Sequence, residues 1–345
     1  MINTKPSELE YLSLSQIILS HMVDGFEGSG LNEAQRIVAD RVVEGEKHLR
    51  ELFPIFSRRY LNSKQPDVAS FKNNLDYLRF IYKKRTHLVD DVVPYLDTVR
   101  RGLIRKYDTL NPSSRSYNSG YCNELMGMPN RIEVAYSSSV RTARMVLFRR
   151  KNMERAIRKI AYRRLLYEIE KKKTPKGNKP PIAKRVDIDD FFGIKAVTSR
   201  EEQARGRLFE NIYLNLHKFD LRADSRQEVV ETEDGEILLP PGVDDHYVDI
   251  KKKRSNIIQL KVHPLHNPNF RLREIDLTDM VNFLVGEMDH VRFSANRENK
   301  AKKLLRERRS YQRRFNQLIR RGNQVVELVP KEVDRMRVLF PSLPF

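Results

Sequence analysis

The spacing of apolar residues changes near residue 190, and this change constrains the fold more than any other feature of the chain. Before it, apolar side chains recur every three or four positions, which is typical of helices. After it, short apolar runs separated by turn residues predict strands, the first of them at 191–197. We therefore expect an α+β fold, in which a domain of mixed helices and strands spans 140–325 and an all-helical region spans 1–135.

The same spacing and the turn residues predict the individual elements. Asp234-Gly235 is a turn signal between two short strands at 229–239. The other expected elements are helices at 71–81, 140–173, 205–216 and from 280 into a basic helix, strands at 257–262 and 272–277, a polar linker at 111–130 and a tail at 326–345.

The chain is strongly basic, and its charge is concentrated in two stretches. Its 345 residues include 65 Lys and Arg against 46 Asp and Glu, a formal net charge of +19. Residues 140–175 hold 13 Lys and Arg against three acids, and residues 292–322 hold 12 against two. Such segregation attracts polyanions, either nucleic acids or nucleoside polyphosphates. The alternative is that these basic helices only present a solubilising surface.

Several classes of protein are excluded by composition. The single cysteine, Cys122, excludes an internal disulfide and a zinc site built from several cysteines. No apolar run is long enough to span a bilayer, and residues 1–10 lack the pattern of a secretory signal. We expect a soluble, cytoplasmic protein without a membrane partner.

Carboxylates stand at the edges of two expected strands. An acidic cluster that ends in Asp190 precedes the strand at 191–197, and Glu274 lies in the strand at 272–277. A carboxylate among apolar neighbours needs a cation, a metal ion or hydrogen bonds to compensate it. Carboxylates on adjacent strands can hold Mg²⁺, which takes oxygen ligands and bridges to substrate phosphates. The alternatives are a capping role for Asp190 and an interior ion pair with an arginine for Glu274.

Residues 190–195 read Asp-Phe-Phe-Gly-Ile-Lys, and residues 273–277 read Arg-Glu-Ile-Asp-Leu. These segments are similar to the Asp-x-x-Gly-Ile-Arg and Glu-x-Gln strands of the RelA/SpoT-type nucleotide pyrophosphokinase (alarmone synthetase) domain. Residues 246–248 stand where that family has Asp-Tyr-Ile. Glu287 and His290 resemble a Glu and a His on its next helix, although an ordinary surface pair is the alternative.

The resemblance, which covers about 155–295, implies a nucleotidyltransferase-like fold with a mixed sheet flanked by helices. It implies Mg²⁺-dependent transfer of a pyrophosphoryl group from ATP to the 3′-hydroxyl of a guanine nucleotide. Asp190 would bind the metal ion, and Glu274 would help to bind it or accept the hydroxyl proton. Basic residues would neutralise the phosphates, since positioning and charge dominate such transfers. These basic residues are Arg158, Lys159, Arg164, Lys195 and Lys252.

Departures from the family pattern predict a divergent member. Lys253 stands where the family has a tyrosine that stacks on the acceptor base, and Asp276 replaces a glutamine. Lys195 replaces an arginine, which keeps the charge but loses the bidentate guanidinium. The acceptor is therefore left open between a nucleotide and an RNA 3′-hydroxyl.

A different class of function is an RNA- or ribosome-binding protein that keeps this fold without catalysis. Aromatic residues beside arginines in 292–322 are typical of RNA-binding surfaces, although Tyr311 and Phe315 also fit the buried stripe of an amphipathic helix. The candidate nucleic-acid-binding residues are Arg308, Arg309, Arg313 and Arg314. Geometry separates the hypotheses: Asp190 and Glu274 in one basic cleft favour catalysis, whereas carboxylates paired with arginines favour a scaffold.

Overall fold

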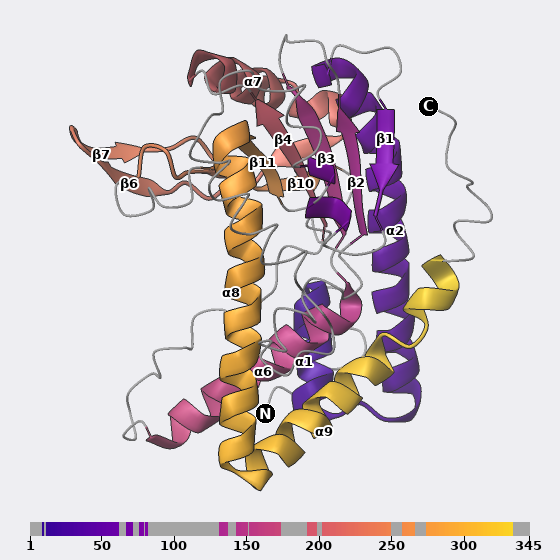
Figure 1. Ribbon diagram of the computed structural model, residues 1–345. Helices are drawn as coiled ribbons and strands as arrows, with labels where there is room; N and C mark the ends of the chain where they lie inside the picture. The colour runs from indigo at the N-terminus through magenta and orange to yellow at the C-terminus, as the bar shows by residue number, and fades with distance from the viewer. Residues whose placement is uncertain are drawn as a thin grey trace.

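The computed structural model describes residue 9 and the segments 12–61, 67–71, 76–78, 80–81, 131–136, 143–150, 152–173, 192–198, 202–249, 257–265 and 274–333. A large sheet with helices on both faces forms one end of the molecule, and a group of helices forms the other (Figure 1). Within these segments, no helix is both long enough and apolar enough to cross a membrane.

The large sheet has seven strands and is mixed. Its strands are β1 (Asp67–Ser70), β2 (Arg131–Tyr136), β3 (Met145–Arg150), β4 (Phe192–Thr198), β8 (Val243–Asp245), β9 (Ile258–Leu260) and β11 (Glu274–Asp279). They lie in the order β1-β2-β3-β4-β11-β9-β8. β4 and β11 are parallel, and the other neighbouring pairs are antiparallel. The parallel pair is joined by a long connection that contains helices and strands, because parallel neighbours need a crossover.

Helices and two small sheets complete the described structure. The helices are α1 (Leu14–Asp24), α2 (Gly28–Leu61), α6 (Met153–Lys173), α7 (Glu202–Leu214), the 3-10 helix η3 (Leu216–Phe219), α8 (Met280–Glu307) and α9 (Arg309–Val325). The small sheets pair β5 (Leu221–Ala223) with β10 (Val262–Pro264) and β6 (Val229–Thr232) with β7 (Gly235–Leu238). Gly235 has a φ of 123°, a backbone conformation that favours glycine, which explains the turn between β6 and β7.

The pleat of the large sheet separates an apolar face from a polar face. Phe148, Ile194 and Ile275 are buried and form one row across β3, β4 and β11, because the register pairs them in this order. Their face packs against α2, whose Phe53 ring lies 6.2 Å from the Phe148 ring. α8 packs against β4 and β11, and its Phe283 approaches Lys195, which alternates with Ile194 and so points to the polar face.

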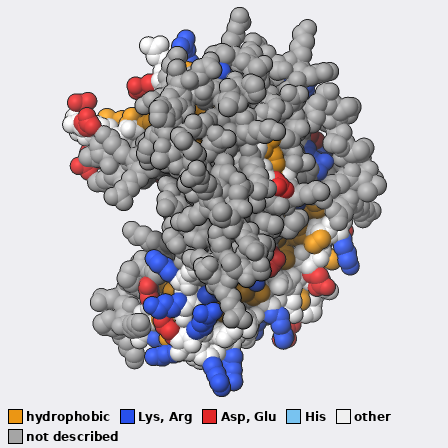
Figure 2. All heavy atoms as spheres, in the orientation of Figure 1, with side chains coloured by type: hydrophobic (Ala, Val, Ile, Leu, Met, Phe, Trp, Pro, Cys, Tyr) orange, Lys and Arg blue, Asp and Glu red, His pale blue; other side chains and the backbone are white. Residues whose placement is uncertain are grey.

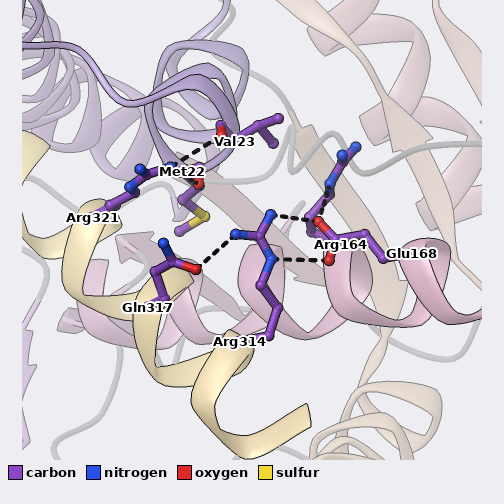
Figure 3. A network of polar contacts seen from close by, with 7 residues as sticks. All are labelled: Met22, Val23, Arg164, Glu168, Arg314, Gln317 and Arg321. Atoms are coloured by element: carbon purple, nitrogen blue, oxygen red, sulfur yellow. Dashed lines mark hydrogen bonds and ion pairs between the residues drawn. The ribbon is translucent and has the colours of Figure 1, made fainter. Parts of the chain in front are cut away.

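The C-terminal helix α9 lies beside α1 and α6 (Figure 1). Leu318 and Val325 on its apolar side are fully buried. Arg321 donates hydrogen bonds to the backbone carbonyls of Met22 and Val23 at the end of α1, at 3.3 and 3.0 Å (Figure 3). These bonds satisfy carbonyls that a helix end leaves without intrahelical partners. Helices from the two ends of the chain therefore form one packed group.

The mixed sheet flanked by helices confirms the expected α+β class. β4, the β6–β7 hairpin, α7, β11 and α8 also lie within a few residues of their predicted positions. The predicted linker at 111–130 lies outside the described residues. Of the helix predicted at 71–81, residues 76–78 and 80–81 are helical, and 72–75 and 79 lie outside the description. Of the expected tail, residues 329–333 are helical and those after 333 are outside the description.

Other expectations need correction. The region before residue 140 is not all-helical, because β1 and β2 extend the large sheet beyond β3. The helix predicted at 140–173 begins only at α6, since the apolar run of β3 is buried between β2 and β4. The strand predicted at 257–262 divides at Lys261 into β9 and β10, which belong to different sheets. The basic helix after 280 breaks at Arg308, whose extended backbone (φ −144°, ψ 127°) separates α8 from α9.

Candidate functional site

A pocket on the polar face of the large sheet, beside α8, gathers charged side chains from four elements. Its lining includes Arg149 of β3, Lys195 of β4, Glu274 and Asp276 of β11, and Glu287 of α8. Tyr77, Leu147 and Phe192 add apolar surface to the lining. Convergent charged groups beside an apolar wall are typical of a ligand site.

The register of three strands arranges the charged residues in two rows. Arg149 pairs with Gly193, which pairs with Glu274 in the parallel neighbour. Two residues further along, Lys195 pairs with Asp276. Paired residues point to the same side of a sheet and side chains alternate along each strand, so both rows share the polar face.

Gly193 leaves an open position between Arg149 and Glu274. A Cβ atom at Gly193 would lie 3.5 Å from the backbone oxygen of Glu274, an ordinary van der Waals contact. The backbone therefore accepts a side chain here, but that side chain would enter the pocket. The glycine therefore leaves this part of the pocket free of a side chain.

The Lys195 ammonium group links the sheet to α8. Its Nζ lies 3.0 Å from Glu287 Oε1 and 3.9 Å from Asp276 Oδ2. The Phe283 ring centroid lies 5.7 Å from the same nitrogen. Because all these groups are largely shielded from solvent, their interactions are less screened by salt than those of a surface pair.

Asp276 has a raised pKa. Burial raises it above its ordinary value, and the neighbouring Glu287 acts in the same direction. Lys195, Arg149 and a 3.4 Å hydrogen bond from Gln259 Nε2 oppose the shift without cancelling it. A carboxylate whose ionised form is disfavoured lowers the stability of the folded protein at neutral pH. Groups with such shifted pKa values concentrate at functional sites.

A polar cluster at Asp279 fixes the start of α8 to the sheet. One Asp279 carboxylate oxygen caps the helix by accepting from two backbone N–H groups of the first turn, both at 2.9 Å. The Tyr247 hydroxyl donates to the other oxygen at 3.0 Å, and the Arg205 guanidinium lies 3.4 Å from the Tyr247 ring centroid. Tyr247 thus positions the helix that carries Glu287 into the pocket.

Only some of the sequence-predicted site residues can be placed in this pocket. Lys195 and Glu274 lie there together. Asp190 and Lys252 lie outside the described residues, so the convergence of Asp190 with Glu274 stays a prediction. Three other predicted phosphate-binding residues lie on α6, which packs against α1 and α9, and do not line the pocket formed by the described residues. These three are Arg158, Lys159 and Arg164.

Two of the predicted basic residues join an ion-pair network between α6 and α9 (Figure 3). Arg164 Nε lies 3.0 Å from Glu168 Oε1, and Arg314 holds the same carboxylate through Nε at 3.0 Å and Nη2 at 2.7 Å. Burial would raise the pKa of Glu168, but the hydrogen bonds and charges of Arg314 and Arg164 outweigh it, so the pKa is lowered. Arg314 therefore joins two helices, whereas Arg308, Arg309 and Arg313 are exposed.

The sequence did not identify Arg149 as a site residue. For Glu287, it allowed both a site role and an ordinary surface pair with His290. Glu287 instead contacts Lys195, and the side chain of His290 lies outside the described residues. Arg149 was placed in a helix, which hid its alternation with Leu147. The four consecutive apolar residues before Arg149 are a signal of a buried strand that could have found it.

The pocket offers carboxylate oxygen, the ligand type that Mg²⁺ prefers, from Glu274. Asp276, which also lines the pocket, contacts Lys195 and Gln259. Among the described residues, no group of three or more His, Cys, Asp or Glu side chains is arranged to hold a metal ion. Magnesium bound here would take Glu274 together with ligand phosphates or water, its usual mode with nucleotides.

Comparison of the chain with family models, curated proteins and solved structures gave no match.

Proposed function

We propose that this chain is a divergent, Mg²⁺-dependent pyrophosphokinase with a nucleotidyltransferase-like sheet. It would transfer a pyrophosphoryl group from ATP to the 3′-hydroxyl of a nucleotide or an RNA. One observation carries the proposal: two motifs far apart in the sequence lie on directly paired parallel strands, with Lys195 and Glu274 in one pocket. Positioning and charge neutralisation, which dominate phosphoryl transfer, need this combination of groups.

The charge balance of the pocket supports a requirement for a divalent cation. Two cations (Arg149 and Lys195) face three carboxylates (Glu274, Asp276 and Glu287) among the described lining residues, which leaves one excess negative charge when all are ionised. An ATP polyphosphate is repelled by such a site unless a cation accompanies it. Bound Mg²⁺ would supply that charge and polarise the phosphate oxygens.

The proposed transfer forms one bond to phosphorus and breaks another. The 3′-oxygen of the acceptor forms a bond to the β-phosphorus of ATP, and the bond from that phosphorus to the α–β bridging oxygen breaks, so AMP leaves. The hydroxyl proton passes to a carboxylate, for which Glu274 is the candidate, or to solvent. Lys195 would exchange its contact with Glu287 for a phosphate oxygen, and Arg149 would neutralise a second one.

An activity assay tests the proposal. The purified chain is incubated with γ-labelled ATP, Mg²⁺ and a panel of guanine nucleotides and RNA 3′ ends, and the products are separated by chromatography. We expect AMP and a labelled, pyrophosphorylated acceptor. Glu274→Gln and Lys195→Met should each lower the rate at least about 100-fold.

Glu154→Gln serves as the matched control, because this carboxylate is 67 % exposed on α6 and should leave the rate unchanged. The proposal fails if no acceptor yields AMP release above the Glu274→Gln background.

A second candidate is a binding protein that keeps the fold without catalysis. It is favoured by the contacts of Lys195 with Glu287 and Asp276, which already neutralise the cation that phosphates would need. Calorimetric titration with Mg·ATP separates the candidates. If the wild type binds Mg·ATP and Lys195→Met binds it more weakly, the enzyme is supported. If the wild type does not bind millimolar Mg·ATP but still binds RNA, the second candidate is supported.

A further inference from the structure

We infer that the elbow between α8 and α9 is a docking surface for the phosphate backbone of a nucleic acid. The elbow cluster is defined as six exposed cations within two turns of the junction: Lys300, Lys303, Arg306, Arg308, Arg309 and Arg313. Blue side chains gather at this end of the molecule in the space-filling view (Figure 2). The inference goes beyond the proposed pyrophosphokinase and does not depend on it.

The cluster keeps a strong positive excess, because the exposed Glu307 is the one acidic residue at 300–313. Among the described residues, no acidic side chain forms an ion pair with any member of the elbow cluster, and Arg308 makes only a cation–π contact with Tyr311, at 5.5 Å. In contrast, Arg314 one turn further along is held by Glu168. Cations without internal partners are available to phosphates, and their mutual repulsion is relieved when a polyanion binds.

The apolar side of α9 is already used by the fold. Leu318 and Val325 are fully buried, and Phe315 and Ile319 pack against the core. A basic helix that inserts into a membrane needs an apolar face, and the apolar side of this helix is packed against the rest of the fold. Among the described residues of α8 and α9, no large hydrophobic side chain is exposed, so the elbow also lacks the apolar centre of a protein interface. The remaining surface suits a partner bound by charge alone.

The elbow is separate from the pocket. Glu287 and Arg306 lie on the same continuous helix, 19 residues apart, which at the helical rise corresponds to roughly 28 Å. A mononucleotide in the pocket cannot reach this cluster. A ligand of the elbow is therefore bound separately from a ligand of the pocket, and phosphates spaced along a nucleic acid strand match cations that are spread over the junction.

The salt dependence of binding measures how many phosphates are engaged. Each phosphate contact contributes a slope of about 0.7 for a single strand when log affinity is plotted against log salt concentration. Six contacts predict a slope near −4. Fluorescence anisotropy with a labelled 20-nucleotide single-stranded RNA and a 20-base-pair DNA duplex, over a range of KCl concentrations, gives this slope. The tighter of the two probes identifies the form of nucleic acid that is bound.

A fourfold variant tests the assignment of residues. Replacing Lys303, Arg306, Arg309 and Arg313 by Gln removes four of the six contacts, so affinity should fall at least about 30-fold and the slope should flatten by about 3. In a second variant, Lys303 is replaced by Arg, and the three arginines are replaced by Lys. This variant keeps all four charges, so its affinity should lie within about threefold of the wild-type value, because phosphates are bound here as point charges. All four side chains are exposed, and circular dichroism checks that the fold is retained.

The matched control changes net charge equally at a distance from the elbow. In this control, Gln replaces four exposed cations on α2, α7, η3 and β5: Arg58, Arg207, Lys218 and Arg222. This control should bind like the wild type. The inference is overturned if the control loses as much affinity as the elbow variant, if the elbow variant binds normally, or if phosphatidylserine vesicles bind at the elbow while neither oligonucleotide does.

Discussion

Ionisation of Asp276 is unfavourable in the folded protein, because burial in β11 raises the pKa of its carboxyl group. The folded state therefore holds a proton on this carboxylate more tightly than the unfolded chain does, and stability is lost as pH rises above the unfolded value near 3.8. We expect Asp276→Asn to raise the free energy of unfolding at pH 7, because the amide avoids the cost of burying a charge. The gain should shrink toward pH 4, where the carboxylate is increasingly protonated. Urea denaturation at both pH values measures it.

Asp40→Asn is the control, since that side chain is 63 % exposed on α2 and should change little at either pH. A variant at position 276 that is less stable than the wild type at pH 7 would show that the contact with Lys195 outweighs the burial of the charge.

Gly193 is the residue through which the pocket can be closed without disturbing the strand. Its backbone accepts a Cβ, and β-branched residues suit strands. We expect Gly193→Ala to weaken Mg·ATP binding slightly and Gly193→Val to weaken it at least about tenfold by steric exclusion. Calorimetric titration of both variants, with thermal melts to verify folding, gives the result. Unchanged affinity in the folded Val variant would place the nucleotide elsewhere.

At the scale of elements, Gly322 sets how closely α9 approaches its neighbours. A Cβ atom there would collide with Met22 Cε and lie 2.8 Å from Ile157 Cγ2. Alanine favours helices over glycine by about 1 kcal/mol, but overpacking a core typically costs 1–3 kcal/mol. We expect Gly322→Ala to lower the free energy of unfolding by about 1 kcal/mol or more, as measured by urea denaturation.

Gly206 in α7 provides the matched control, because no atom lies within 4 Å of a Cβ built at that position. Gly206→Ala should stabilise the protein by up to about 1 kcal/mol. Stabilisation of equal size at Gly322 would contradict close packing between α9, α1 and α6.

Elements with strong local signals were predictable. β4 was visible as a short apolar run and β11 as a short segment that mixes apolar and charged residues. The β6–β7 turn was visible as Asp234-Gly235, and α8 as a long periodic stretch. β3 was not, because a short apolar run flanked by arginines fits a helix as well as a strand. The division of 257–262 between two sheets could not be predicted either, since it depends on which strands pair with β9 and β10 in the folded chain.

At the scale of the whole molecule, the pocket and the elbow cluster lie toward opposite ends of α8. A substitution in one site should therefore leave ligand binding at the other site unchanged. We expect the fourfold Gln variant of the elbow to lose RNA binding at least about 30-fold and to keep Mg·ATP affinity within about twofold. Glu274→Gln should retain RNA binding. Parallel calorimetric and anisotropy titrations of both variants test this, and simultaneous loss of both activities in either folded variant would show that the sites are coupled.

The sequence by itself determined the α+β class, the order of the central elements, the basic character and where along the chain that charge is concentrated, because composition, periodicity and turn chemistry are local properties. Only the tertiary structure decided that Arg149, Lys195, Glu274, Asp276 and Glu287 share one pocket, and that Arg314 serves the packing of α9 while Arg308, Arg309 and Arg313 stay exposed. The physical reason is that strand register and helix docking are set between distant segments, and a shift of one residue in register would turn each strand's charged side chains to the opposite face.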